Sequence, residues 1–128
     1  MKSKKMQVVL CDPGKPARIE TIDNTLDSLQ GAVGGSIQAV YPFDDPVAIV
    51  CNEEGKISGM ELNRALQSED GSVYDILAGP FLVVGLGNED FDSLSPEYLE
   101  KYRKRFEQPE IFLCVHGEIL VIPVSVEV

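Results

Sequence analysis

The sequence predicts a single compact α+β domain, with a mixed or mostly antiparallel sheet, two to three helices and a C-terminal β-hairpin. Three observations lead to this prediction. At 128 residues the chain has the length of one ordinary domain. Its composition, 44% hydrophobic and 25% charged, is that of a globular protein. Short apolar runs between Gly, Pro and Asp residues are typical of strands, and two segments space their apolar residues as helices do.

A β-hairpin is expected at the start of the chain. Residues 6–11 form a short apolar run that predicts a strand, and residues 12–16, with the sequence DPGKP, predict a turn. Residues 17–22 follow with a weaker alternation of apolar and polar side chains. We expect them to form the partner strand.

The first helix is expected to end at a glycine pair. Three apolar residues share one helical face by their spacing: Leu26, Leu29 and Val33. Asp23 or Asn24 can cap the start of this helix. Gly34 stands where a left-handed C-cap residue belongs, and Gly35 allows the chain to return to the sheet. We therefore expect the pair to stop a helix and not to cradle a ligand.

The middle of the chain predicts the centre of the sheet. Residues 37–41 alternate as a strand does, and residues 47–51 are apolar throughout, which is typical of a strand covered on both faces. Residues 62–67 predict one or two turns of helix. Residues 73–79 and 81–87 predict two strands, which we expect at the centre of the sheet.

The C-terminal part predicts a helix followed by a hairpin. Ser95 can cap the helix, Pro96 suits its first position, and Leu94 can pack onto Leu99 across the cap. Two apolar runs within residues 111–126 are joined by His116 and Gly117, which predict a two-residue hairpin turn.

Charge restricts the partners of the protein. With 21 acidic and 11 basic residues the chain has a net charge of −10, which repels nucleic-acid phosphates and anionic lipids. The basic run at residues 101–105 is balanced by Glu97, Glu100 and Glu107 on the same helix. We expect no nucleic-acid or membrane partner. A protein partner, of basic character if any, and a monomeric or weakly homodimeric state are expected.

The cysteines indicate a reducing compartment. Cys11, Cys51 and Cys114 are odd in number and far apart, so we expect buried, reduced thiols. A nucleophilic thiol would need a base, and the only histidine, His116, shares a strand face with Cys114 by spacing. The basic N-terminus precedes an apolar run too short for a secretory signal. We expect a cytoplasmic protein with no catalytic residues, metal site or cofactor.

One polar grouping lies within the predicted core and is the candidate binding site. Asn52 and Glu53 end an apolar strand, Asn63 and Arg64 open the predicted helical turn, and Asp75 interrupts an apolar strand. A buried aspartate needs a cation or several donors, and Arg64 is the natural partner. Either an Arg–Asp brace or a ligand pocket would explain the grouping.

The chain resembles a known family at this grouping. The segments GKP, TLDSLQGAVGGSI, CNEEGK, LNRAL and DILAGPFLVVG, within residues 13–87, resemble domain of unknown function 3846. The resemblance implies a short protein of Firmicutes, their phages or conjugative elements, and it assigns no activity. Residues 88–128 would then be a helix and hairpin added to a family-like core. Seven residues match the family motif without an assigned role: Asn52, Glu53, Gly55, Asn63, Arg64, Asp75 and Gly79.

Two functions are consistent with these observations. The first is a non-enzymatic accessory protein of a mobile element or its host, acting through contacts with other proteins. The second is a module that binds a small ligand, a nucleotide or another anion, at a site centred on Arg64. A deep pocket beside Arg64 would favour the second function, and an exposed apolar patch or strand edge would favour the first.

Overall fold

The computed structural model describes residues 5–125 and confirms the α+β fold. A sheet of six strands forms the centre of the molecule. Five of them lie in the order β2-β1-β7-β4-β3, and the sixth, β8, pairs with β7. Every pair of neighbouring strands in this sheet is antiparallel. Its strands are β1 (Lys5–Cys11), β2 (Arg18–Asp23), β3 (Ile37–Val40), β4 (Val47–Asn52), β7 (Phe81–Leu86) and β8 (Phe91–Asp92).

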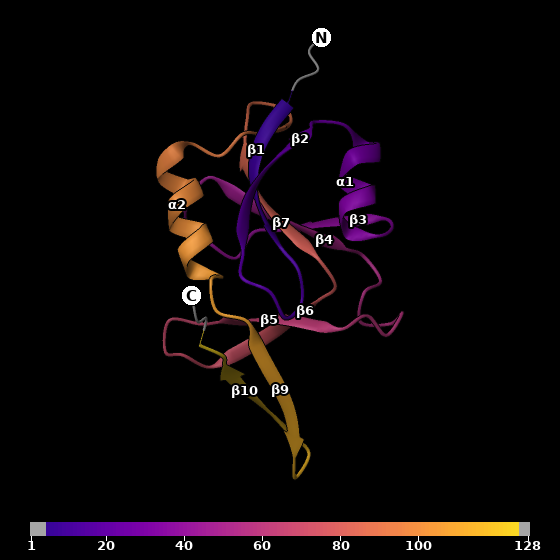
Figure 1. Ribbon diagram of the computed structural model, residues 1–128, viewed down its shortest axis with the longest axis vertical. Coiled ribbons are helices and arrows are strands. Elements are labelled where there is room, and N and C mark those ends of the chain that lie inside the picture. Colours follow the sequence, from indigo (N-terminus) through magenta and orange to yellow (C-terminus); the bar gives the residue numbers. More distant parts are fainter. Residues whose placement is uncertain (1–4, 126–128) are drawn as a thin grey trace.

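The sheet is buried on both faces. Helix α1 (Leu26–Val33) packs on one face, and α2 (Pro96–Arg105) packs on the other, as Figure 1 shows at the right and left of the sheet. The central strands β1, β4 and β7 supply alternate residues to the two sides. The α1 side contains Val8, Val50 and Leu82, and the α2 side contains Val9, Ile49 and Val83. The prediction that residues 47–51 are covered on both faces is confirmed.

A separate pair of strands lies below the main sheet (Figure 1) and corrects two predictions. β5 (Leu62–Gln67) and β6 (Val73–Ala78) form a two-stranded sheet of their own. The helix predicted at residues 62–67 is wrong, because four consecutive residues of β5 are buried against neighbours on both sides. β6 is not at the centre of the main sheet, whereas β7 is.

Helix α1 begins at a different residue from the one expected. Thr25 is the N-cap, and its side-chain oxygen accepts a hydrogen bond from Ser28 N at 3.1 Å. Asp23 is still part of β2, and Asn24 donates its side-chain amide to Phe91 O, so neither residue caps the helix. The predicted cap is therefore one to two residues early.

The glycine pair after α1 ends the helix as predicted. Gly34 has φ 82° and donates its N–H to Gln30 O at 2.8 Å. Gly35 N–H donates to the same carbonyl, at 3.0 Å. Two amides that would be free in a ligand cradle are therefore used within the chain.

Helix α2 also begins as predicted. Ser95 caps it by accepting a hydrogen bond from Tyr98 N at 3.4 Å, and Pro96 is its first residue. Leu94 and Leu99 are buried in the same cluster, which agrees with packing across the cap.

The predicted C-terminal hairpin is present and projects from the rest of the molecule (Figure 1). β9 (Glu110–Val115) and β10 (Glu118–Pro123) are joined by His116 and Gly117, which have φ 52° and 80°. Positive φ at both positions is the geometry of a two-residue turn that matches strand twist.

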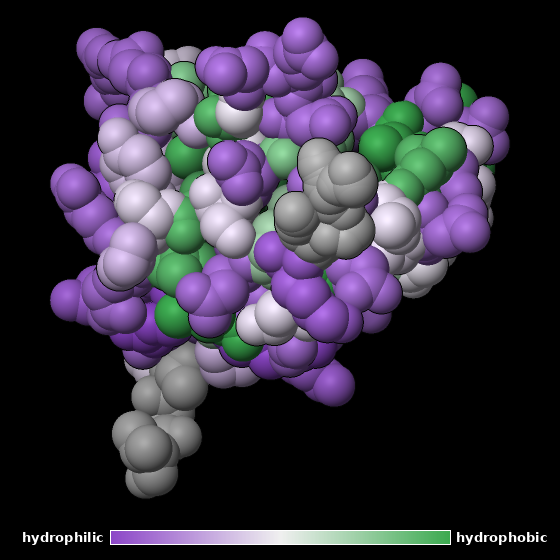
Figure 2. Space-filling model, turned by 90° about the horizontal axis from the view of Figure 1, so that it is seen from above, coloured by the Kyte–Doolittle hydropathy of each residue, from purple (hydrophilic) through white to green (hydrophobic). Residues whose placement is uncertain are grey.

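The opposite end of the molecule has a polar surface. Figure 2 views that end from above, and hydrophilic residues cover most of it, with hydrophobic residues in small patches. Among residues 5–125, no helix has the length and apolar character needed to cross a membrane.

Two glycines provide a matched test of the packing. We expect Gly85→Ala to lower the free energy of unfolding by about 1–3 kcal/mol, because the new Cβ would collide with Ser93 O where β8 meets β7. Gly31→Ala should instead raise it by up to about 1 kcal/mol, because Gly31 lies within α1 with open space around it. Urea denaturation measures both changes. Equal effects of the two variants would contradict the packing described here.

Candidate functional site

The five residues of the predicted site fall into two separate groups. Asn63 and Arg64, on β5, are buried in the interior. Asn52, Glu53 and Asp75 line a pocket between β4 and β6. Arg64 is not among the residues that line this pocket.

The guanidinium of Arg64 joins three segments of the chain. Only 1% of the residue is exposed. Its Nη2 donates to Lys15 O and to Phe106 O, both at 2.7 Å. Its Nη1 donates to Asn63 Oδ1 at 2.9 Å and to the backbone oxygen of Asn63 at 3.2 Å. The turn after β1, strand β5 and the end of α2 are therefore held at one point.

These bonds satisfy a buried cation through neutral oxygens. Phe106 is the C-cap of α2, where the helix dipole places partial negative charge, so its carbonyl is a favourable acceptor for a guanidinium. Burial lowers the pKa of Arg64, and the nearby Cys11 and Glu110 act in the opposite direction. Because the ordinary pKa of arginine is so high, the group stays charged. Among the described residues its Nε has no hydrogen-bond partner.

Asn63 extends this network to the main sheet. Its Nδ2 donates to Cys11 O at 3.0 Å and to Gly79 O at 2.9 Å. The pairing of β5 with β6 is irregular at this point, because Leu62 and Arg64 lie opposite consecutive residues of β6. Such a bulge allows the adjacent side chains of Asn63 and Arg64 both to be buried.

The predicted pairing of Asp75 with Arg64 is wrong. Asp75 Oδ1 accepts from Lys56 Nζ at 2.6 Å and from Ile76 N at 2.8 Å, and the side chain is 42% exposed. The alternative expectation, a backbone donor, is confirmed. The register explains the difference, because Arg64 lies opposite Leu77 and not opposite Asp75. An ion pair this exposed contributes little stability.

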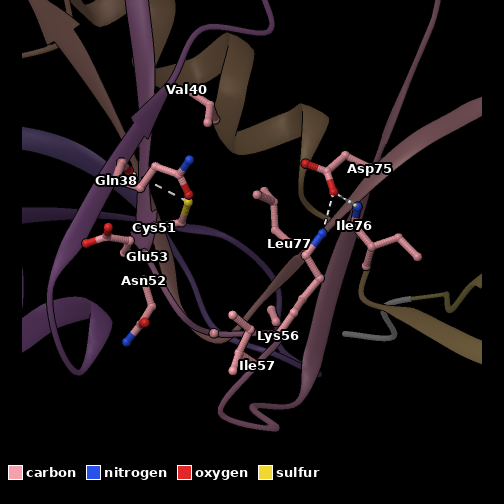
Figure 3. A pocket seen from close by; sticks show the side chains of 12 residues that line it. Gln38, Val40, Cys51, Asn52, Glu53, Lys56, Ile57, Asp75, Ile76 and Leu77 are labelled. Carbon is pink, nitrogen blue, oxygen red and sulfur yellow. Dashed lines mark hydrogen bonds and ion pairs between the residues drawn. The ribbon is translucent and has the colours of Figure 1, made fainter.

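The pocket has a volume of about 270 Å³, and both polar and apolar side chains line it (Figure 3). Gln38, Cys51, Asn52 and Glu53 lie on one side of it, and Asp75 lies on the other. The paired Lys56 and Asp75 occupy the same rim. Their pairing occupies Lys56, the one cationic side chain among the residues that line the pocket.

Asn52 in the pocket wall has a structural role. Its Nδ2 donates to Val33 O at 3.1 Å, and its Oδ1 accepts from Glu54 N at 2.8 Å. Asn52 therefore satisfies a carbonyl at the end of α1 and stabilises the turn after β4.

The prediction that all three cysteines are buried is correct for two of them and wrong for the third. Cys11 and Cys51 are buried, but Cys114 is exposed because it lies on the projecting hairpin. Burial raises the pKa of the Cys11 thiol to about 12 and also raises the pKa of Cys51. These two thiols are protonated at neutral pH and are therefore poor nucleophiles. No group of three His, Cys, Asp or Glu side chains in residues 5–125 could hold a metal ion.

A surface that we did not single out from the sequence lies on the hairpin. Cross-strand partners share a face, and the register pairs Ile111 with Ile122 and Leu113 with Leu120. Together with Val115 they form an aliphatic surface, here called the hairpin face: Ile111, Leu113, Val115, Leu120 and Ile122, each 40–49% exposed. Covering the exposed half of each side chain would contribute about 1 kcal/mol per residue. The sequence signal is the lack of polar alternation in both strands.

The comparisons place the protein in a family. The structure is a small α+β domain in which the buried Arg64 joins three segments. The greater part of the chain matches a family model. The model is Domain of unknown function (DUF3846), and it matches residues 6–107, so the chain belongs to this family. The matched region extends beyond residues 13–87 at both ends and includes α2, whereas β9 and β10 lie outside it. No curated protein and no solved structure matches the chain.

Removing the Arg64 side chain tests the brace. We expect Arg64→Met to lower the free energy of unfolding by about 3 kcal/mol or more, because buried acceptors such as Lys15 O and Phe106 O lose their donor. Asp75→Asn is the control and should cost less than about 1 kcal/mol, because its ion pair is largely solvated. Urea denaturation of both variants measures these losses. Similar losses would mean that Arg64 is not the principal brace.

Proposed function

We propose that this protein is a non-enzymatic accessory protein that acts through contacts with other proteins, using the hairpin face. The observation that carries the proposal is the exposed aliphatic surface of Ile111, Leu113, Val115, Leu120 and Ile122 on a projecting hairpin. Contiguous exposed apolar surface is characteristic of interaction sites in soluble proteins.

The exposure of the hairpin supports this proposal further. A two-stranded hairpin alone is only marginally stable in water, and stability normally requires packing of its apolar side chains. Here Phe112 and Val121, on the opposite side of the hairpin, are half-buried, whereas all five residues of the hairpin face are 40–49% exposed. Near the turn, Ile119 and Cys114 on the opposite side are exposed as well. A partner that covers the face would supply the missing packing.

The interior groups with unusual environments all have structural partners, which supports a non-enzymatic role. Arg64 donates to four oxygens at the junction of three segments, and Cys11 is a protonated thiol beside Asn63. The pairing of Lys56 with Asp75 likewise occupies the rim of the pocket. The bonds of Arg64 and the burial of Cys11 thus have a structural explanation that requires no reaction.

The proposal also covers the biological origin of the protein, its cellular compartment and the class of its partners. Its resemblance to proteins of Firmicutes, phages and conjugative elements supports a bacterial, mobile-element context. The free Cys11 and Cys51 support a reducing compartment, the cytoplasm. The net charge of −10 supports the absence of nucleic acid among its partners.

The pocket between β4 and β6 supports a second candidate function, the binding of a small polar ligand. Its volume of about 270 Å³ suits a molecule of a few heavy atoms. The ligand would contact Asn52, Glu53 and Asp75. An anion would have to compete with Asp75 for Lys56, and Arg64 would take no part.

Affinity purification with matched variants tests the first proposal. The bait would be the full chain, the hairpin variant Leu113→Lys/Leu120→Lys, or the control Leu26→Lys, which changes an exposed leucine on α1. We expect a protein captured by wild type and control, and unaffected by nuclease, to be lost from the hairpin variant, because two buried lysines would oppose docking. Capture that is equal for all three baits, or that depends on nucleic acid, would contradict the proposal.

A further inference from the structure

We propose that the occupant of the hairpin face is a second copy of this chain, bound face to face about a two-fold axis. This inference rests on the proposed function, in which the hairpin face is the contact surface. The face consists of aliphatic side chains that are complementary to themselves: Ile111, Leu113, Val115, Leu120 and Ile122. A two-fold interface needs a surface that matches its own copy.

The position of charge on the hairpin favours this occupant over a basic partner. Glu118 is opposite Val115 next to the turn, so it lies at one end of the face. Glu110 is opposite Pro123 and therefore belongs to the other side of the hairpin. A surface adapted to a basic protein would carry several carboxylates, whereas Glu118 is the only charged residue among the three cross-strand pairs of this face.

An antiparallel arrangement also answers the objection that two chains of charge −10 repel each other. If the axis passes near Leu113 and Leu120, the two turns point in opposite directions and the acidic bodies lie at the two ends. Strands of six residues span roughly 20 Å. The Debye length at physiological salt is only about 8 Å, so repulsion between the bodies is largely screened.

The size of the face predicts a weak dimer. Five half-exposed aliphatic residues per copy are far fewer than the roughly 20–30 residues a side of a standard stable interface. We therefore expect a dissociation constant on the order of 10–100 µM, so that dilute protein is monomeric.

Sedimentation equilibrium of the full chain tests this inference between about 5 and 500 µM. The wild type and Leu26→Lys should shift from monomer towards dimer, whereas Leu113→Lys/Leu120→Lys should weaken association about 100-fold or more, because symmetry introduces each lysine twice. Added NaCl should leave the dimer unchanged or strengthen it, since salt screens repulsion between acidic bodies. Circular dichroism checks that the variants remain folded.

Disulfide cross-linking tests the geometry independently. In a Cys114→Ser background, which removes the exposed thiol, Leu113→Cys lies near the expected axis and Leu26→Cys lies on α1. Diamide oxidises two thiols to a disulfide and is itself reduced. We expect a cross-linked dimer for Leu113→Cys and not for Leu26→Cys.

A chain that remains monomeric at 500 µM, or that cross-links equally at both positions, would overturn the inference. If hairpin-dependent capture of a different protein were observed together with a monomeric chain, the second copy would be excluded while the proposed function remained. If neither capture nor association depended on the hairpin face, both would fail.

Discussion

The burial of one guanidinium is the constraint on which the rest of the structure depends. Arg64 is enclosed without a carboxylate in hydrogen-bond contact, so its charge must be satisfied by oxygens brought from elsewhere in the chain. Lys15 O, Phe106 O and the side chain of Asn63 meet this need only when three segments occupy one position. Phe106 O also accepts from Ala17 N, so the end of α2 is tied to the approach to β2 as well. A polar network of this kind specifies a single arrangement because each missing partner would leave a buried group unsatisfied.

The same junction sets the direction of the hairpin. The chain passes from Phe106 at the end of α2 to β9 within a few residues, and Glu110 Oε1 accepts from Ala65 N, next to Arg64. At the base of the hairpin, Val124 N donates to Pro109 O at 2.7 Å. β9 is thus fixed to β5 at its first residue, while its remaining length extends away from the body (Figure 1). The hydrogen bonds around Arg64 therefore also hold the base of the hairpin, and through it they position the hairpin face.

The sequence predicted those parts of the fold that follow from local patterns. The apolar run of β4, the glycine stop at Gly34 and the Ser95 cap depend on nearby residues, and all three were identified correctly. Strand β5 was missed because its residues favour a helix, and only its pairing with β6 and its burial in the folded protein make it a strand. The partners of Arg64 could not be predicted, since they are backbone carbonyls distant in the sequence. The exposure of the hairpin was missed because a continuous apolar run does not show whether a core lies beside it.

Site-resolved amide hydrogen exchange of wild type and Arg64→Lys would test the role of the buried guanidinium most directly. Lysine keeps the charge, but its single ammonium nitrogen cannot occupy the positions of both Nη1 and Nη2, so it cannot make all four hydrogen bonds of Arg64. We predict faster exchange at Ala17 N, which donates to Phe106 O, and at Ala65 N, which donates to Glu110, while amides of the central strand β7 remain protected. Unchanged exchange at Ala17 and Ala65, or a change confined to the pocket around Asp75, would contradict the account.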